Sequence, residues 1–165
     1  LMLFLSAAYS VPPLRFKSIP IVDLASHGLF FGALLFLYGS SAVGSFNTQG
    51  AFLIASIFLF SMTLELRNHI EDMGEDAWAD IKTTVCWLGL GNARKLLMIL
   101  LVGHWLSLIA LLVFTDLQIN LMVTGITAVV LSSLMIIKSC PKLILRTIDL
   151  YTCVIYALVI LLPLL

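Results

Sequence analysis

Charged residues are scarce in this sequence of 165 residues. They make up 11% of it, against 61% for apolar residues, whereas an ordinary soluble domain is roughly 25% charged. The mean hydropathy is correspondingly high, at +1.12. This amount of apolar surface exceeds what a water-soluble fold of the same length can bury. The composition therefore predicts an integral membrane protein.

A basic excess and a cysteine pattern are also absent. Nine basic residues balance nine acidic ones, which argues against nucleic acid as a partner, because nucleic-acid-binding domains carry a basic surface. The three cysteines have a spacing that fits neither a zinc site nor a disulfide framework. The first residues lack the charged segment and small-residue cleavage site of a signal peptide. The lipid bilayer remains as the expected environment.

Five apolar stretches are long enough to cross a bilayer, since a helix needs about 20 residues to span about 30 Å of hydrocarbon. They lie at residues 20–43, 49–68, 95–115, 118–137 and 146–165. Before them, residues 1–8 are interpreted as the end of a further helix. We predict an all-α fold, a multi-span transmembrane helical bundle with about five full spans and a partial N-terminal helix. Residues 1–165 would form a single membrane domain.

Basic residues fall on one side of the membrane if these spans alternate in direction. They precede the first span, separate the second from the third, and separate the fourth from the fifth. They are Arg15, Lys17, Arg67, Lys82, Arg94, Lys95, Lys138, Lys142 and Arg146. Short loops rich in Lys and Arg stay in the cytoplasm. The pattern supports the span count and predicts that residues 66–84 lie on the cytoplasmic side.

The few acidic residues gather in that same loop, with six of the nine in residues 65–80. Asp72, Asp76 and Asp80 are four residues apart, and Asn68 stands one step earlier, so on a continuous helix they share a face. Like charges at this spacing destabilise a helix unless a cation lies over them. Magnesium binds one or two carboxylates and keeps other positions for water and phosphate. The row of four predicts a Mg²⁺ cofactor that clamps a diphosphate.

A second segment, YSVPPLRFK at residues 9–17, supplies cations on the same side. Its two prolines are expected to stop the preceding helix. The chain would then present Arg15 and Lys17 at alternate positions of an extended stretch, so that both point the same way. Together with Lys82 they are candidate ligands of a diphosphate. The same cations also suit a topology anchor, and the two interpretations are compatible.

Other interpretations of the acidic stretch remain open. A charge run beside a span is commonly just a solvated helix end. A cation transporter could use the same carboxylates, although transporter sites usually lie near the bilayer midplane. The cluster falls at the end of a predicted span and beyond it, which favours an enzyme over a transporter.

Several polar residues fall within or beside the predicted spans. Asp23 and His27 are four residues apart and could hydrogen-bond each other, because polar groups inside a membrane need partners. His104 and Asp149 are either functional candidates or ordinary contacts between helices. His69 lies beside the acidic row, where it could support a ligand of the metal or remain exposed.

Residues 72–89 resemble a known motif. Asp72-Met-Gly-Glu-Asp76, followed by Ile81-Lys-Thr-Thr84 and Leu88-Gly89, is similar to the second aspartate-rich motif of the UbiA superfamily of intramembrane prenyltransferases. In that motif DxxxD leads to a threonine and a leucine-glycine pair. Residues 9–17 are similar to the cytoplasmic loop after the fourth span of the family. The resemblance covers the whole chain, as the C-terminal half of a nine-helix protein.

The resemblance implies a helical bundle around a central cavity that opens to lipid. Two aspartate-rich motifs there hold magnesium on a prenyl diphosphate, and Asp72 and Asp76 match the catalytic metal-binding pair. Asp80 stands where many members have glycine. The implied reaction is transfer of an isoprenyl group to a lipophilic acceptor within the bilayer. The sequences of residues 9–17 and 68–76 look most like members acting on carotenoids or other polyisoprenoids.

Transfer of this kind forms an allylic cation, which aromatic faces can stabilise. Trp78, Trp87, Trp105 and Tyr151 are candidates by residue type, but membrane anchoring or packing is the favoured role for each. The first aspartate-rich motif of the family does not occur in these residues. We therefore expect a missing N-terminal half to supply it, and the 165 residues alone to be inactive.

Overall fold

The computed structural model describes residues 2–43, 47–115, 118–138 and 142–161, and within these ranges it contains helices and no strand. The chain forms two compact units, Leu1–Ser107 and Leu108–Leu165. The all-α class is therefore confirmed, whereas the single membrane domain stays a prediction.

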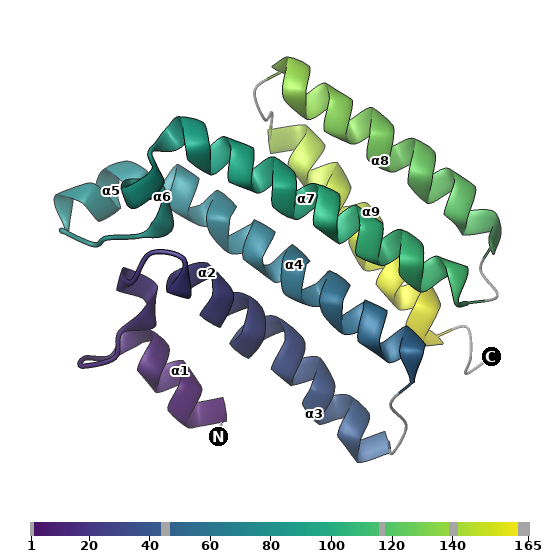
Figure 1. Cartoon of the computed structure of the whole chain (residues 1–165), viewed down its shortest axis with the longest axis horizontal. Helices are drawn as coiled ribbons and strands as arrows, with labels where there is room; N and C mark the ends of the chain where they lie inside the picture. Colours follow the sequence, from purple (N-terminus) through teal and green to yellow (C-terminus); the bar gives the residue numbers. More distant parts are fainter. Residues whose placement is uncertain (1, 44–46, 116–117, 139–141, 162–165) are drawn as a thin grey trace. The chain divides into compact units, whose positions relative to one another are not determined.

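The first unit holds most of the helices (Figure 1). They are α1 (Met2–Ser10), the 3₁₀ turn η1 (Phe16–Ser18), α2 (Val22–His27), the π-helical turn η2 (Gly28–Ala33), α3 (Leu34–Val43), α4 (Thr48–Glu71), α5 (Met73–Trp78), α6 (Thr84–Leu88) and α7 (Leu90–Val113). Helix α1 ends just before the two prolines, as expected from their missing N–H donors. Helices α2, η2 and α3 follow one another directly and make one long helix.

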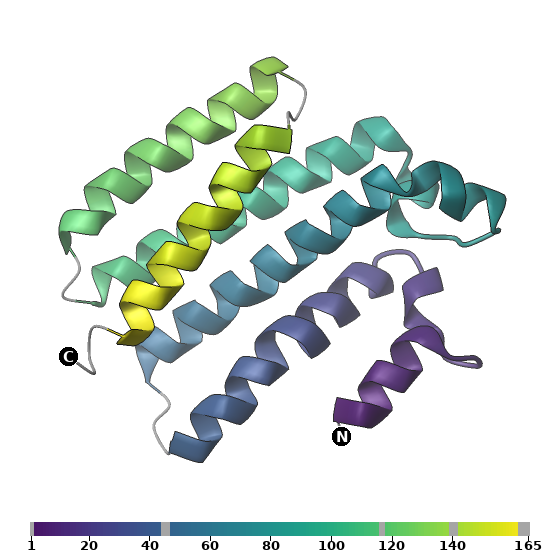
Figure 2. The ribbon, with the colours of Figure 1, turned by 180° about the vertical axis from the view of Figure 1, so that it is seen from behind.

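Helix α4 lies between α3 and α7 in the two opposite views of Figures 1 and 2. A close approach at Gly28 brings η2 against α4, because a Cβ there would lie 2.7 Å from Met62 Cγ. On the other flank, His104 of α7 is fully buried, and its Nδ1 lies 3.1 Å from Ser56 Oγ. Small residues and interhelical hydrogen bonds hold membrane helices together, since lipid tails are as apolar as leucine.

The second unit contains the end of α7 together with α8 (Gln118–Lys138) and α9 (Lys142–Leu161). Helix α9 buries one face, which carries Ile144, Ile148 and Ile155. A hydrogen bond of 2.7 Å between Thr124 and Tyr151 joins α8 to α9. The unit thus follows the same plan of apolar packing with a polar contact between helices.

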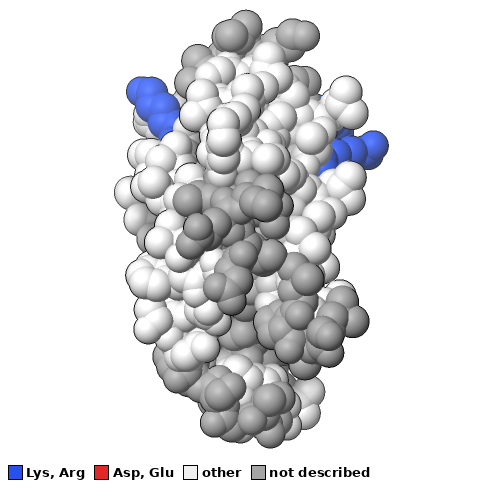
Figure 3. Space-filling view, turned by 90° about the vertical axis from the view of Figure 1, so that its right-hand side faces the viewer, with Lys and Arg blue, Asp and Glu red and all other residues white. Residues whose placement is uncertain are grey.

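Four helical stretches are long and apolar enough to cross a membrane: Val22–Ser41, Thr48–Glu71, Leu90–Val113 and Lys142–Leu161. Part of α8, Met122–Leu134, forms a shorter apolar helix. Each predicted span therefore falls on a helix over its described residues, and residues 162–165 of the last predicted span lie outside the described ranges. Large apolar side chains remain exposed on these helices, and the described surface in Figure 3 shows basic side chains only at its margins and no acidic one. Such a surface suits contact with lipid.

Candidate functional site

The acidic stretch forms two helices and a turn rather than one continuous helix. Helix α4 ends at Glu71, Asp72 forms the junction, and α5 ends at Trp78. Asp80 then adopts a left-handed conformation with φ 52. The prediction of a shared helical face through Asp80 is therefore wrong. The physical reason is that α5 buries no residue, so no packing offsets the repulsion between carboxylates four residues apart.

The four-residue spacing nevertheless survives across the junction. The amide of Asp72 donates to the Asn68 carbonyl at 2.8 Å, and the amide of Asp76 donates to the Asp72 carbonyl at 2.9 Å. These bonds keep Asn68, Asp72 and Asp76 on one side of the chain. Asp80 follows the end of α5 and leaves this row.

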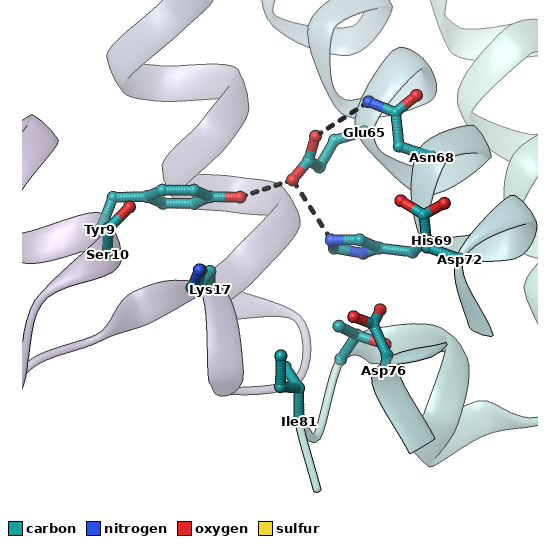
Figure 4. Close-up of a pocket in the computed structure, with 10 residues that line it drawn as sticks. Tyr9, Ser10, Lys17, Glu65, Asn68, His69, Asp72, Asp76 and Ile81 are labelled. Atoms are coloured by element: carbon teal, nitrogen blue, oxygen red, sulfur yellow. Dashed lines mark hydrogen bonds and ion pairs between the residues drawn. The ribbon is translucent and has the colours of Figure 1, made fainter. Parts of the chain in front are cut away.

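A cavity of about 270 Å³ opens beside that row (Figure 4). Its walls come from α1, η1, α4, the junction, α5 and the segment before α6. The lining residues are Tyr9, Ser10, Lys17, Glu65, Asn68, His69, Asp72, Asp76, Ile81 and Thr83. The structure thus brings three of the four predicted metal ligands to one cavity, and Asp80 is not among its lining residues.

Of the three predicted diphosphate ligands, only Lys17 lines the cavity. Lys17 belongs to η1 and lies on the opposite side of the cavity from Asp72 and Asp76 (Figure 4). Arg15 adopts a left-handed conformation with φ 35, so the predicted extended stretch is wrong. The 3₁₀ turn that follows Arg15 is closed by the Ser18 amide, which donates to the Arg15 carbonyl at 3.0 Å. Lys82 is exposed outside the lining.

Glu65 is the centre of a buried polar cluster that forms one wall of the cavity. Oε1 accepts the Tyr9 hydroxyl at 2.5 Å and lies 3.2 Å from His69 Nε2. Oε2 lies 3.4 Å from His27 Nε2 and accepts a hydrogen bond from the side-chain Nδ2 of Asn68 at 3.4 Å. Burial and the Glu65 carboxylate raise the pKa of the Tyr9 phenol above its ordinary value, so the phenol keeps its proton and donates it. Glu65 joins α1, α2 and α4 at this point.

Asp23 extends the cluster from the other side of His69. Its Oδ2 lies 3.5 Å from His69 Nδ1, a separation that suits charge attraction rather than a hydrogen bond. The same carboxylate accepts the backbone N–H of Thr84 at 2.7 Å and the Thr84 hydroxyl. His69 therefore lies between two carboxylates and is buried, which excludes the exposed position, one of the two alternatives that the sequence left open.

The predicted pairing of Asp23 with His27 is wrong, because both side chains bond to other helices. His27 Nδ1 lies 3.1 Å from Ser61 Oγ of α4, while Asp23 bonds to Thr84. The physical reason is tertiary packing, which brings Ser61 of α4 to His27 and Thr84 of α6 to Asp23. His104 bonds to Ser56, which is the interhelical contact that sequence allowed as one of two roles.

Aromatic residues at the cavity differ from those that residue type suggested. Tyr9 lines the cavity and packs edge-on against Phe31, with ring centroids 5.6 Å apart. Trp78 is 91% exposed, Trp87 is also exposed, and Trp105 is buried at 3%. Trp105 therefore packs in the core.

Sequence reasoning missed Tyr9 and Glu65 as parts of the site. Both carried a signal: Glu65 lies one helical turn before Asn68 and His69, and Tyr9 is the first residue of the segment 9–17 that carries Lys17. Their hydrogen bond spans 56 residues of sequence, and periodicity within one helix does not reveal a contact of that range.

The residues at the cavity fit a magnesium ion that would bind together with a phosphate-containing substrate. No group of three or more His, Cys, Asp or Glu side chains is arranged for a metal within the described residues. Magnesium needs only one or two carboxylates when substrate oxygens and water complete its shell. Asp72 and Asp76 supply two carboxylates, and Asn68 directs its amide nitrogen to Glu65, which leaves its oxygen as a further donor.

Known proteins resemble this chain in sequence. Residues 1–142 match the model of the UbiA prenyltransferase family. The chain is 32% identical over 130 residues to the lycopene elongase/hydratase of Haloarcula japonica, covering 74% of this chain and 43% of that protein. It is 31% identical over 119 residues to the lycopene elongase/hydratase of Halobacterium salinarum, covering 72% and 40%. The chain thus spans about two fifths of the length of these relatives. No solved structure matches.

Proposed function

Because the chain belongs to the UbiA prenyltransferase family, we propose that the whole protein transfers an isoprenyl group from a prenyl diphosphate to a lipophilic acceptor within a membrane. The observation that carries the proposal is the cavity itself. It places Asp72 and Asp76 on one side and Lys17 on the other (Figure 4). No ion pair joins Lys17 to either carboxylate among the described residues, so space remains between opposite charges.

The charges at the cavity suit a diphosphate bound together with magnesium. Asp72, Asp76 and the Asn68 oxygen would hold the ion, which when bound supplies charge neutralisation for the departing diphosphate. Lys17 binds diphosphate oxygens directly, as a point charge that does not demand a fixed direction. Neither the magnesium ion nor Lys17 is sufficient alone. Without the ion, the carboxylates of Asp72 and Asp76 would repel an anionic substrate.

The wall of the cavity on the α1 side controls what surrounds the prenyl group. Tyr9 faces the cavity, and Phe31 and His27 lie behind its ring. We expect this wall to exclude water from the allylic carbon, because water would capture the cation before the acceptor does. The aromatic faces also favour a cation over a neutral group.

The acceptor that we propose is a long polyisoprenoid, such as a carotenoid. The relatives named above are lycopene elongase/hydratases, and the sequences of residues 9–17 and 68–76 resemble members with such acceptors. An acceptor of this kind reaches the reacting carbon from the lipid phase. This fits a site built at the end of membrane helices.

The first aspartate-rich motif of the family does not occur in these 165 residues. We propose that other residues of the whole protein supply it, and that this chain alone binds diphosphate without catalysing transfer. We further propose that the cavity faces the cytoplasm, because Lys17 and the acidic segment share one end of the helices. In a variant without native cysteines, Asp80→Cys should react with an impermeant maleimide only in inside-out vesicles.

The central experiment replaces the two carboxylates that line the cavity. Asp72→Ala and Asp76→Ala are made in the protein expressed from its whole coding region and placed in nanodiscs. Each should lower magnesium-dependent transfer from a labelled prenyl diphosphate to lycopene by at least about 100-fold, the usual scale for losing charge stabilisation at a reacting centre.

Glu75→Ala is the matched control. Glu75 is an exposed acid of α5 that does not line the cavity, so its loss should leave transfer within about twofold of the unaltered rate. Undiminished transfer by the Asp72 and Asp76 variants would refute the proposed site. Uptake of radioactive cations into vesicles without any prenyl transfer would instead support a transporter.

A further inference from the structure

Asp23, at the start of α2, binds Thr84, the residue that follows the acidic segment of residues 72–83. Its side chain is fully buried. Oδ2 accepts the Thr84 N–H at 2.7 Å, and Oδ1 accepts the Leu24 N–H at 2.7 Å and the Thr84 hydroxyl. Thr84 Oγ1 in turn accepts the Ile21 N–H at 2.6 Å. These bonds join two points that are 61 residues apart in sequence.

Ile21 marks how tightly this junction is built. Its φ is 69 and its ψ is −43, a conformation with positive φ that a β-branched residue adopts only when its surroundings impose it. The conformation directs the Ile21 N–H to Thr84. The start of α2 and the start of α6 are therefore fastened by side-chain and backbone groups together, and we name the Asp23–Thr84 pair the clasp.

The clasp also reaches the other end of the acidic segment. Asp23 Oδ2 lies 3.5 Å from His69 Nδ1, and His69 Nε2 lies 3.2 Å from Glu65 Oε1. His69 belongs to the last turn of α4, beside Asn68 and three residues before Asp72. The buried Asp23 carboxylate thus lies against a residue on each flank of residues 72–83: His69 before them and Thr84 after them.

Between those two ends the segment has little packing of its own. Helix α5 buries no residue, and Trp78 is 91% exposed. The Ile81 amide donates to the Asp76 carbonyl at 2.9 Å. Asp76 is therefore linked through a short turn to the residues that directly precede Thr84. The direction of Asp76 therefore depends on how firmly the segment is held at Thr84.

We infer that Asp23 and Thr84 are positioning residues for the diphosphate site, which fix residues 72–83 so that Asp72 and Asp76 face Lys17 before the ligand arrives. The inference rests on the proposed function. A segment that is already ordered spends no binding energy on ordering itself. Loosening the clasp therefore weakens ligand binding, while the groups that contact the diphosphate stay unchanged in kind.

A matched pair of substitutions tests the clasp. Thr84→Val keeps the shape of the side chain and removes the hydroxyl, whereas Thr84→Ser keeps the hydroxyl. In the whole protein in nanodiscs, Thr84→Val should weaken binding of inorganic pyrophosphate in magnesium about tenfold, the factor for one hydrogen bond to a charged group. Thr84→Ser should bind within about twofold of the unaltered protein. KM for the prenyl diphosphate should rise more than kcat falls.

Amide exchange supplies a readout that does not depend on activity. Residues 72–83 should exchange faster in Thr84→Val, with the rest of α4 unchanged. Thr124→Val is the control, because it removes a buried threonine hydroxyl bonded to Tyr151 and should alter neither exchange in residues 72–83 nor pyrophosphate binding.

A second variant and a measurement on the unaltered protein cover the case in which Thr84→Val does not fold. Asp23→Asn replaces one acceptor oxygen and should weaken pyrophosphate binding to a similar extent. In the unaltered protein, the Thr84 amide should exchange as slowly as the core of α4. Pyrophosphate binding at the original strength in either folded variant, or rapid exchange of the Thr84 amide, would overturn the inference that the clasp positions the site. A lack of magnesium-dependent binding by the unaltered protein would refute the proposed function, and the inference with it.

Discussion

Two pairs of carboxylates in the first unit differ in what surrounds them. Asp23 and Glu65 are buried, and each accepts hydrogen bonds from more than one helix or loop. Asp72 is exposed and Asp76 is half-buried, and both line the cavity. All four lie at the same end of the helices, within one small region of the fold.

The difference shows how a membrane protein can keep acidic residues for two purposes. A buried carboxylate costs free energy unless the protein supplies its partners, and Tyr9, His27, His69 and Thr84 do so here. A carboxylate at the cavity does not need partners from the protein and remains able to bind a cation. We therefore expect substitutions of the buried pair to change stability first and substitutions of the cavity pair to change ligand binding first.

The largest expected effect is on folding. Glu65→Ala removes the acceptor of the Tyr9 hydroxyl and the charge between His27 and His69. It should lower the free energy of unfolding by about 3 kcal/mol, the scale for breaking a buried charged pair. Unfolding in mixed micelles measures the loss. Asp72→Ala is the control and should stay within about 0.5 kcal/mol; equal losses in both variants would contradict the distinction between the pairs.

Metal removal is next in size and should act on the cavity pair alone. Chelation by EDTA should weaken pyrophosphate binding about 100-fold, because Asp72 and Asp76 then face the anion without a bridging cation. In the absence of pyrophosphate, EDTA should leave the unfolding temperature unchanged. Calorimetric titration and thermal unfolding give the two values. Binding of equal strength with and without EDTA would remove magnesium from the site.

A smaller effect is expected from the cation opposite the carboxylates. Lys17→Met keeps much of the side-chain length and removes the charge, and it should weaken pyrophosphate binding about tenfold. Lys95→Met serves as the control, because Lys95 is exposed on α7 and does not line the cavity. The same titration measures both variants. A tenfold loss in each would show that general surface charge, not Lys17, attracts the anion.

The smallest effect concerns two glycines of one long helix, which repeat the contrast between filled and open surroundings. A Cβ at Gly28 would lie 2.7 Å from Met62 Cγ, whereas a Cβ at Gly39 would meet nothing within 4 Å. Gly28→Ala should lower stability by about 1 kcal/mol through overpacking. Gly39→Ala should be neutral or stabilising by up to about 1 kcal/mol, since alanine favours a helix. Unfolding in micelles compares the two, and greater stability of Gly28→Ala would argue against the close approach.

Much of the fold could be predicted because membrane helices are local features. A run of about 20 apolar residues must satisfy its own backbone hydrogen bonds in lipid, which it does as a helix. Over its described residues, each of the five predicted spans accordingly falls on a helix, although one of them, Met122–Leu134 of α8, is a shorter apolar helix. The break at Asp72 could not be predicted, because it depends on a lack of packing around α5.

The site was predictable only in part, for the same reason. The spacing of Asn68, Asp72 and Asp76 is written in the sequence, and all three reach the cavity. Arg15 and Lys17 look alike in sequence, yet a left-handed backbone at Arg15 leaves only Lys17 at the cavity. Backbone conformation in a short loop follows from tertiary contacts more than from residue type.

The sequence by itself determined the membrane class, the helices and the row of Asn68, Asp72 and Asp76, because hydropathy and four-residue spacing are properties of neighbouring residues. Tertiary structure decided which acids became internal partners and which stayed open to a ligand. Those pairings cross 56 residues from Tyr9 to Glu65 and 61 from Asp23 to Thr84. They depend on which helix faces pack together, and in lipid that choice follows from close fit and polar contacts rather than from hydropathy.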